Sequence, residues 1–405
     1  MEVRFKICLL FVCTFQMAAA QNFRSVTVQP SSAIWQLGSS ETLRIGFDDL
    51  NDEQITLRYR LQHCNPDFTP SGLREQETVA GINEVNILDN ELSFNTRTNY
   101  VHYSFSFPPA EARPRVSGNF LIQIYDVDYP SKYLLEIPVR VYEDLTRFEA
   151  SVGAPRRVEY SKTKQELQVT AQVNQSLPIT NTANVLLLVR QNQNVRTARQ
   201  IPLTSSNGNY LEFRYEDALI FDGLNEYRNF DIRPLTYTAY GVFSNELRGD
   251  TRHITLYTDK SFLGFEYAST DDINGQYVIK AAGQSNSDSE ADYVMVHFTL
   301  ESAFIPNADV YVMGDFTQWQ SSPEYKMTYD AGRGEYLLDL PLKQGFYDYT
   351  YDVVRNGGST SQDDFIFFGN TFYETENTYF LYLYYRPPGG VAHRLIGYRQ
   401  ISSRK

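Results

Sequence analysis

The histidines, cysteines and paired acids are the side chains from which this 405-residue chain would build a reactive site. The five histidines stand at positions 63, 102, 253, 297 and 393, and no two of them have the spacing of zinc ligands on a helix. The sequence contains neither a Gly-x-Ser-x-Gly elbow nor a glycine-rich phosphate loop. We therefore expect no catalytic residue, no metal ion and no cofactor, and the sequence predicts that the protein is not an enzyme.

One adjacent pair, His63 and Cys64, has the residue types of a base and a nucleophile. Successive residues of a strand point to opposite faces of the sheet, so these two side chains are not expected to meet. The alternative is that Cys64 is a small buried apolar side chain, which is a common fate of a free cysteine. We favour this second interpretation.

Four acidic pairs offer a different chemistry, because close carboxylates bind calcium or flank a glycosidic bond. None of the pairs follows the twelve-residue calcium-loop pattern, and aspartate is common in turns. We favour solvated turn acids, and a carboxylate pair stays open as an alternative. The pairs are Asp48 with Asp49, Asp126 with Asp128, Asp271 with Asp272, and Asp363 with Asp364.

Two predicted strands frame the most informative stretch of the chain. Apolar residues alternate with polar ones over 55–61 and again over 101–107, which is the period of half-buried strands. The polar segment between them contains Pro66, Pro70 and two glycines. A connection this long and rich in turn residues is typical of a binding surface.

The composition predicts the fold class. Aromatic residues make up 14% of the chain, with 30 Tyr and 26 Phe, and such residues suit pleated, half-buried surfaces. We predict an all-β protein of tandem immunoglobulin-like β-sandwiches. The formal net charge of −13 argues against general nucleic-acid binding, which needs a basic surface.

The first twenty residues have the pattern of a secretory signal peptide. Arg4 and Lys6 precede an apolar run over 7–15, and three alanines at 18–20 supply a cleavage site. Cys8 and Cys13 lack the small residues that precede a lipid-modified cysteine. The sequence predicts an exported chain that carries no lipid anchor and no spanning helix.

We expect three domains after this signal peptide, at 21–143, 144–258 and 259–405. The segment 284–290 is polar and of low complexity, and it predicts a flexible loop or linker. Residues 379–385 are apolar on both faces, so another domain or a partner must cover one face. Strands of the first domain are expected near 26–28, 43–47, 55–61, 85–88, 100–107, 120–125 and 135–141.

The segment from Val312 to Trp319 resembles the early-set immunoglobulin-like modules that bind glycogen or starch. Those modules typically have Gly-x-Phe-Asn-x-Trp, and here Thr317 replaces the asparagine. An exposed Trp319 would stack on a sugar ring, whereas a buried Trp319 would belong to the core. We favour the core, and the sugar site defines our alternative function, a polysaccharide-binding accessory protein.

Several separate motifs resemble the plug protein of the type IX secretion system of Bacteroidota. They lie at 59–71, 93–96, 100–103, 117–120, 272–278, 291–294, 313–319, 384–386 and 394–398, and thus span nearly the whole mature chain. Phe68 stands where a tryptophan is expected, which preserves the aromatic character.

This resemblance implies a non-enzymatic periplasmic protein at the inner face of the outer membrane. It would cap the periplasmic opening of the large SprA-type translocon barrel when no cargo is engaged, and other periplasmic secretion components are possible further partners. The alternative for its motif residues is that they fix turns. The candidates for partner contact are His63, Asn65, Pro66, Asp67, Phe68, Ser71, Phe94, Asn95, Tyr100 and His102.

Overall fold

The computed structural model describes residues 22–51, 54–355, 364 and 366–404. The predicted signal peptide lies outside these residues. The regular secondary structure of the described chain is almost entirely strands, with short α-helices at Glu75–Thr78 (α1) and Ser287–Glu290 (α2), so the predicted all-β class is confirmed. Within that part of the chain, no helix has the length and apolar character needed to cross a bilayer.

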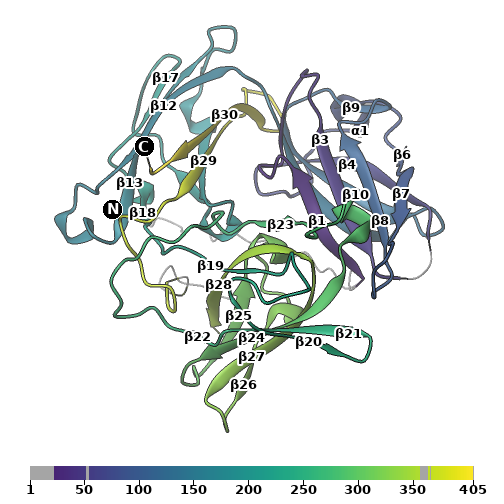
Figure 1. Cartoon of the computed structure of the whole chain (residues 1–405). Helices are drawn as coiled ribbons and strands as arrows, with labels where there is room; N and C mark the ends of the chain where they lie inside the picture. Colours follow the sequence, from purple (N-terminus) through teal and green to yellow (C-terminus); the bar gives the residue numbers. More distant parts are fainter. Residues whose placement is uncertain (1–21, 52–53, 356–363, 365, 405) are drawn as a thin grey trace.

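The first of three sandwiches occupies the N-terminal part of the chain, drawn in purple and blue in Figure 1. Alternating apolar residues of its two sheets, such as Ile45, Tyr59 and Ile122, meet in one buried core. One sheet has the order β1 (Phe23–Gln29), β3 (Leu43–Asp49), β8 (Val101–Phe107), β7 (Asp89–Leu92). The other has the order β2 (Ile34–Gln36), β11 (Tyr133–Tyr142), β10 (Gly118–Asp126), β4 (Leu57–Cys64), β6 (Val85–Asn86), and a small pair joins β5 (Val79–Gly81) to β9 (Ala112–Pro114).

The second sandwich combines the middle of the chain with its C-terminal strands. Val189, Leu211 and Leu383 show this in their shared core, because the last of them comes from the far end of the sequence. One sheet has the order β12 (Thr146–Gly153), β13 (Lys164–Val173), β17 (Tyr210–Phe213), β16 (Ser205–Asn207), with β18 (Ile220–Asp222) also on β13. The other has the order β15 (Arg199–Ile201), β14 (Val185–Gln191), β29 (Thr378–Tyr385), β30 (Arg394–Ser402).

The third sandwich lies below the other two in Figure 1. Phe230, Val296 and Tyr347 belong to the core between its sheets. One sheet joins β19 (Arg228–Asp231), β28 (Gly345–Arg355), β23 (Tyr277–Ile279) and β25 (Ala308–Met313). The other joins β20 (Val242–Arg248), β21 (Thr251–Leu256), β24 (Tyr293–Glu301), β27 (Glu335–Lys343), β26 (Thr328–Asp330) and β22 (Asp259–Lys260).

Short 3-10 helices connect several strands of the second and third sandwiches. The last two, η5 and η6, lie in the segment that resembles the early-set modules or directly after it. They are η1 (Val158–Tyr160), η2 (Thr182–Asn184), η3 (Val195–Thr197), η4 (Asp217–Leu219), η5 (Asp315–Thr317) and η6 (Pro323–Tyr325).

Strand pairing does not follow the sequential division at 258/259. Strands β19 and β21 precede that point but pair with β28 and β24, which follow it, whereas β29 and β30 return to the second sandwich. Both sheets of the first sandwich, in contrast, lie within 21–143. Sequence order does not predict these pairings, because hydrogen-bonded neighbours in a sheet need not be neighbours in the chain.

The segment 284–290 is packed, so the predicted flexible linker is wrong. Asn286 caps α2 through its side chain, which accepts from the backbone N–H of Asp288. The Ser289 carbonyl accepts a hydrogen bond from the backbone N–H of Phe94 in the first sandwich. Small polar residues are common both in loops and at helix N-termini, and in this segment they cap and form a short helix.

Candidate functional site at the sandwich junctions

The ten predicted contact residues fall into two groups on the first sandwich, and each group borders a different neighbour. Those at 63–71 lie towards the second sandwich, and those at 94–102 lie towards the third. The side chains of His63, Tyr100 and His102 are buried, whereas those of Asp67, Phe94 and Asn95 are exposed. The remaining four, Asn65, Pro66, Phe68 and Ser71, are half-buried.

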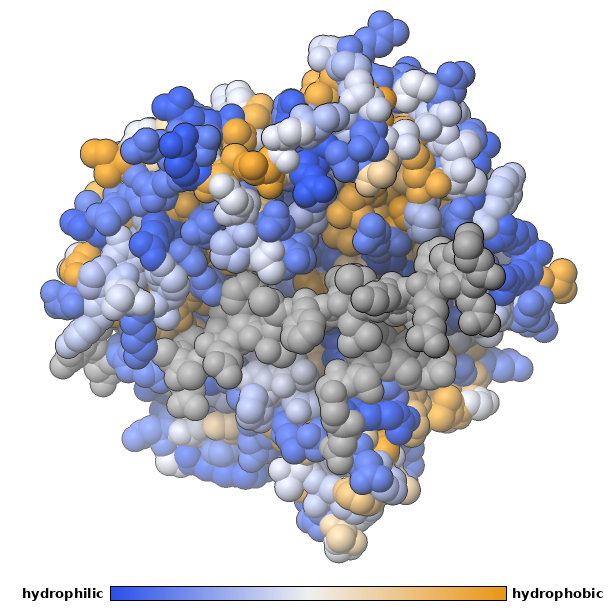
Figure 2. Space-filling model, turned by 180° about the vertical axis from the view of Figure 1, so that it is seen from behind, coloured by the Kyte–Doolittle hydropathy of each residue, from blue (hydrophilic) through white to orange (hydrophobic). Residues whose placement is uncertain are grey.

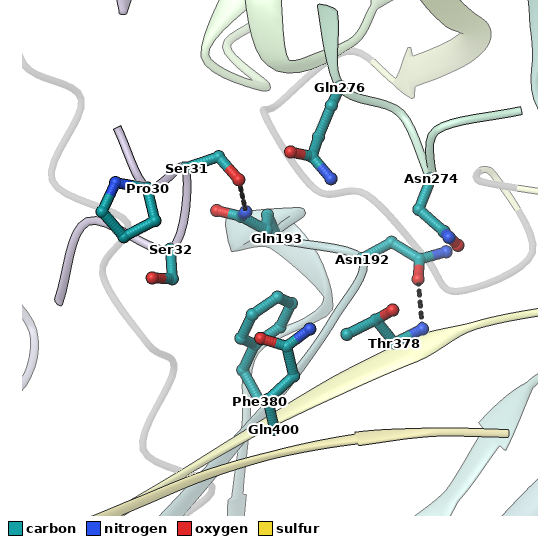
Figure 3. Close-up of a pocket in the computed structure, with 10 residues that line it drawn as sticks. All are labelled: Pro30, Ser31, Ser32, Asn192, Gln193, Asn274, Gln276, Thr378, Phe380 and Gln400. Atoms are coloured by element: carbon teal, nitrogen blue, oxygen red, sulfur yellow. Dashed lines mark hydrogen bonds between the residues drawn. The ribbon is translucent and has the colours of Figure 1, made fainter. Parts of the chain in front are cut away.

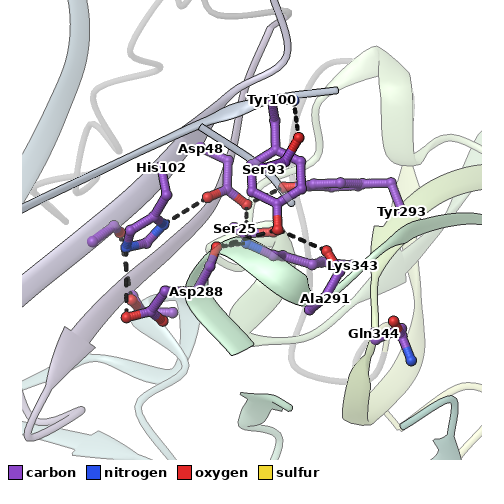
Figure 4. Close-up of polar contacts among 12 residues, drawn as sticks. Ser25, Asp48, Ser93, Tyr100, His102, Asp288, Ala291, Tyr293, Lys343 and Gln344 are labelled. Atoms are coloured by element: carbon purple, nitrogen blue, oxygen red, sulfur yellow. Dashed lines mark hydrogen bonds and ion pairs between the residues drawn. The ribbon is translucent and has the colours of Figure 1, made fainter. Parts of the chain in front are cut away.

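The junction with the third sandwich is held by a buried ionic network, which we call the polar clamp and define as Asp48, His102, Tyr293 and Lys343 (Figure 4). Asp48 and Lys343 are 0% and 1% exposed, and the Lys343 Nζ lies 2.7 Å from Asp48 Oδ2. The Tyr293 hydroxyl donates to the same oxygen at 2.7 Å. His102 Nδ1 lies 2.7 Å from the other carboxylate oxygen.

Local structure explains how the clamp is placed. Asp48 on β3 and His102 on β8 are cross-strand partners in one sheet, so their side chains share a face. Tyr293 begins β24 and Lys343 ends β27, and these two residues are also cross-strand partners. Each sandwich therefore contributes one registered pair of residues. A Cβ on Gly46 would lie 3.1 Å from the His102 ring, so the missing side chain makes room for it.

Tyr100 and α2 complete this junction. The Tyr100 hydroxyl donates to the Ala291 carbonyl at 2.8 Å, and the Lys343 ammonium lies 4.1 Å from the centre of the Tyr100 ring. The Lys343 ammonium also donates to the Asp288 carbonyl at 2.7 Å. The predicted contact residue Tyr100 thus makes its contacts within the molecule, and the backbone N–H of Phe94 donates to the Ser289 carbonyl at 2.9 Å.

Burial dominates the electrostatics of the clamp. It lowers the pKa of the Lys343 ammonium, and the neighbouring Asp48 carboxylate offsets this only in part. Burial, followed by the negative charge of Asp48, raises the pKa of the Tyr293 hydroxyl well above its ordinary value. These groups make a charge-assisted hydrogen-bond network suited to holding two sandwiches together.

The junction with the second sandwich is mainly aromatic, and we define this aromatic interface as Asn119, Arg140, Tyr382 and Tyr384. The Tyr384 hydroxyl donates to Asn119 Oδ1 at 2.7 Å. The Arg140 guanidinium lies 4.6 Å from the centre of the Tyr382 ring. Residues 379–385 are therefore covered on their second face by another sandwich, and this prediction is confirmed.

The motif at 63–71 supports this interface from behind. Asn119 Nδ2 donates to the carbonyls of Asn65 and Pro66 at 3.2 and 3.0 Å. The ring of Phe68 lies 5.0 Å from the Arg140 guanidinium. The motif residues thus fix the side chains that meet β29.

His63 has a structural position in the same region. Its Nε2 lies 3.2 Å from the Ser117 carbonyl, and its Nδ1 lies 2.8 Å from the Ser71 hydroxyl. Gly118 has φ of 141°, and a Cβ there would lie 2.4 Å from His63 Nε2, so only glycine fits. The thiol of Cys64 instead contacts the Gln62 carbonyl, and burial raises its pKa to about 12. This makes it a poor nucleophile, as expected for a buried apolar side chain.

A small polar pocket lies where all three sandwiches meet (Figure 3). It has a volume of about 120 Å³ and is lined by neutral side chains. Gln193 donates to the hydroxyl of Ser31 at 3.1 Å, linking the second sandwich to the first. Asn274 and Gln276 enter from the third sandwich. Its lining residues include no acid, base or thiol, so we interpret this pocket as part of the hydrogen-bonded contact between the sandwiches.

Trp319 and part of the acidic pairs are buried in the interior of the protein. Trp319 is 3% exposed and packs in a cluster with Tyr227 and Met313, so its ring has no free face for a sugar. The expectation of solvated turn acids is wrong for Asp48 and Asp49, which are both buried on β3, and Lys343 compensates the charge of Asp48 in the interior. The pair Asp363–Asp364 is described only at its second residue, and Asp364 is buried beside Arg355 rather than solvated. The described residues hold no group of three or more side chains arranged for a metal ion.

Sequence reasoning missed Lys343, Asp288 and the structural role of Asp48. A lysine at the end of an amphipathic strand has no local feature that distinguishes it from a surface residue. The motif at 291–294 contains Tyr293 and was the sequence signal that pointed to this part of the polar clamp.

These features define a class of protein: an all-β assembly of three sandwiches locked together by buried contacts. The family model for the first domain of the type 9 secretion system plug protein matches residues 14–143. The N-terminal sandwich is a domain of this plug-protein family, and the resemblance noted in the sequence is confirmed over residues 14–143.

A solved structure of a hypothetical protein from Parabacteroides merdae ATCC 43184 is also similar. The two chains share 28% sequence identity with a TM-score of 0.89, over 94% of this chain and 97% of the other. A similarity of this extent means that the arrangement of the three sandwiches is shared. No curated protein matches the sequence.

Proposed function

We propose that this protein is a periplasmic plug that closes the periplasmic opening of the large SprA-type outer-membrane translocon barrel when no cargo is engaged. The observation that carries the proposal is the match of residues 14–143 to the first domain of the type 9 secretion system plug protein. A role in the secretion machinery is structural, and it requires adhesion and shape rather than bond-making chemistry.

The two junctions support this function by making the molecule rigid. A stopper for a wide pore must resist deformation, and a chain of loosely tethered domains would leave gaps. Here the polar clamp and the aromatic interface bury contacts on two sides of the first sandwich. We therefore expect the sandwiches to move as one body.

The exposed members of the predicted contact set are the candidates for touching the barrel. Phe94 is 62% exposed, although its backbone N–H is held by the Ser289 carbonyl. A rigidly mounted aromatic ring supplies contact area at low entropic cost. Asp67 and Asn95 are exposed polar neighbours in the two motifs. Outside the grey atoms, the face shown in Figure 2 is largely hydrophilic, with hydrophobic residues in separate small patches.

Affinity capture tests the proposal. Tagged full-length protein added to detergent-solubilised outer membranes of the source cells is expected to recover the translocon barrel, identified by mass spectrometry. The Phe94→Ser variant is expected to recover less, and Phe265→Ser is the matched control because Phe265 is 63% exposed at a different site. Capture without the barrel contradicts the proposed function.

The structure does not favour the polysaccharide-binding alternative. It depended on an exposed Trp319, and that ring is buried against Tyr227 and Met313.

A further inference from the structure

A cleft with aromatic walls lies between strand β1 and the third sandwich, beside the polar clamp. Its volume is about 340 Å³, within the range of roughly 300–1,000 Å³ typical of small-ligand pockets. Tyr277 stacks on Tyr347 with ring centres 5.5 Å apart, and Phe316 meets the same Tyr347 edge-on at 5.4 Å. The aromatic residues that line the cleft are Phe23, Tyr277, Tyr293, Phe316, Tyr325 and Tyr347.

Three charged side chains line the cleft, and two of them neutralise each other. Arg24 and Glu324 form an ion pair at 2.8 Å across the junction. The third is Asp315, the first residue of η5, whose backbone N–H donates to the Gly275 carbonyl at 2.8 Å. The net charge of the lining at neutral pH is therefore negative.

The carboxylate of Asp315 is incompletely compensated. Among the described residues it has neither a hydrogen-bond donor nor an ion-pair partner, and Arg190 acts on it only from a distance. Burial raises the pKa of this carboxyl to about 6. A half-buried carboxylate without a partner costs free energy that a bound cation would recover.

We propose that this cleft binds an organic cation, an ammonium or guanidinium group, with Asp315 as the counter-charge and the aromatic rings as its walls. Aromatic faces attract such cations through the ring quadrupole, and removal of water strengthens the attraction. Guanidinium suits the site best, because its flat, weakly hydrated plane stacks on rings while its N–H groups reach a carboxylate. The cation comes either from a basic side chain of a polypeptide or from a free amine.

Calorimetric titration of the full-length protein at about pH 8, where Asp315 is ionised, tests this site. The probes are methylguanidinium and n-butylammonium, with tert-butanol as an uncharged control. Both cations are expected to bind saturably, and tert-butanol is not. Asp315→Asn is expected to weaken binding by about tenfold or more. The matched control is Asp309→Asn. Asp309 lies on β25 and forms a solvent-accessible ion pair with Lys326, so this variant is expected to leave binding unchanged.

A second comparison identifies the source of the cation. Tighter binding of the capped peptide Gly-Arg-Gly than of methylguanidinium supports a polypeptide ligand. Tighter binding of putrescine than of n-butylammonium supports a free amine. A thermal melt of Asp315→Asn verifies that the variant is folded. The proposal is overturned if the wild type binds neither cation, if Asp315→Asn binds equally well, or if Asp309→Asn loses as much affinity. These outcomes do not depend on capture of the barrel.

Discussion

The two junctions of the first sandwich hold it by opposite means. The polar clamp places a carboxylate, an ammonium, an imidazole and a hydroxyl in a space from which water is excluded. The aromatic interface buries tyrosine rings, one asparagine and the face of Arg140. One junction depends on charge and the other on contact area.

This difference assigns the junctions different roles. Taking charges out of water costs several kcal/mol per ion, and the lowered pKa of Lys343 shows that burial outweighs the attraction of Asp48. Buried aromatic surface contributes stability roughly in proportion to its area, and the guanidinium of Arg140, the one ion in the aromatic interface as defined, lies over the Tyr382 ring. We infer that the aromatic interface supplies most of the binding free energy, and that the clamp fixes the orientation of the sandwiches.

Breaking the clamp is expected to have the largest effect. Lys343→Ala leaves the Asp48 carboxylate buried without its cation, so the free energy of unfolding should fall by about 3–5 kcal/mol. Urea unfolding measures this. Lys326→Ala is the control, because it removes a solvent-exposed pair with Asp309 and should cost less than about 1 kcal/mol.

A double variant separates charge from packing at the clamp. Asp48→Asn with Lys343→Met removes both charges, while the amide oxygen introduced by the first substitution remains an acceptor for the Tyr293 hydroxyl. It should recover most of the loss seen in Lys343→Ala, because no uncompensated charge remains. A double variant as unstable as the single one would show that the charges themselves stabilise the fold.

A pair of hydroxyl deletions compares the junctions directly. Tyr293→Phe removes a hydrogen bond to a buried carboxylate and should cost about 1.5–3 kcal/mol, whereas Tyr384→Phe removes a hydrogen bond to the amide oxygen of Asn119 and should cost about 1 kcal/mol. Chemical denaturation of both variants provides the test. Equal losses would remove the distinction between the carboxylate-centred polar clamp and the aromatic interface.

Asp315 provides a smaller effect with a defined pH dependence. Its pKa is about 6 in the folded chain and about 3.9 when unfolded, so the ionised carboxylate destabilises the fold above pH 6. Asp315→Asn should therefore raise stability at about pH 8 by on the order of 1–2 kcal/mol. This gain should shrink as the pH falls through 6 towards 4, which thermal melts at several pH values would reveal. A gain that is constant with pH would contradict this assignment.

The smallest expected effect comes from His63, the buried imidazole behind the aromatic interface. Burial lowers its pKa in the folded state, so below about pH 6.5 the unfolded chain takes up a proton that the folded chain does not. Stability should fall as the pH drops through this window. Comparing His63→Gln with the wild type isolates this contribution, since the variant should show a shallower slope; parallel slopes would exclude it.

Much of the first sandwich could be predicted from the sequence because its information is local. Alternation over 55–61 and 101–107 predicted strands β4 and β8, and the double-sided apolar run at 379–385 required a cover on both faces. Periodicity reports which face of a strand is buried. It does not report which distant element does the burying.

The rest depended on pairings that no spacing encodes. Asp48 and Lys343 are separated by 295 positions, and each alone is typical of a surface residue. The return of β29 and β30 to the second sandwich is equally invisible in the sequence. The linker prediction at 284–290 failed because serine, asparagine and aspartate serve loops and helix caps alike.

The most direct measurement is the ion conductance of the purified translocon barrel in a planar bilayer, before and after this protein is added on the periplasmic side. The proposed function predicts that an open barrel closes as the protein approaches an equimolar amount, and that cargo reopens it. Conductance that stays unchanged while the protein is bound to the barrel would contradict the plug.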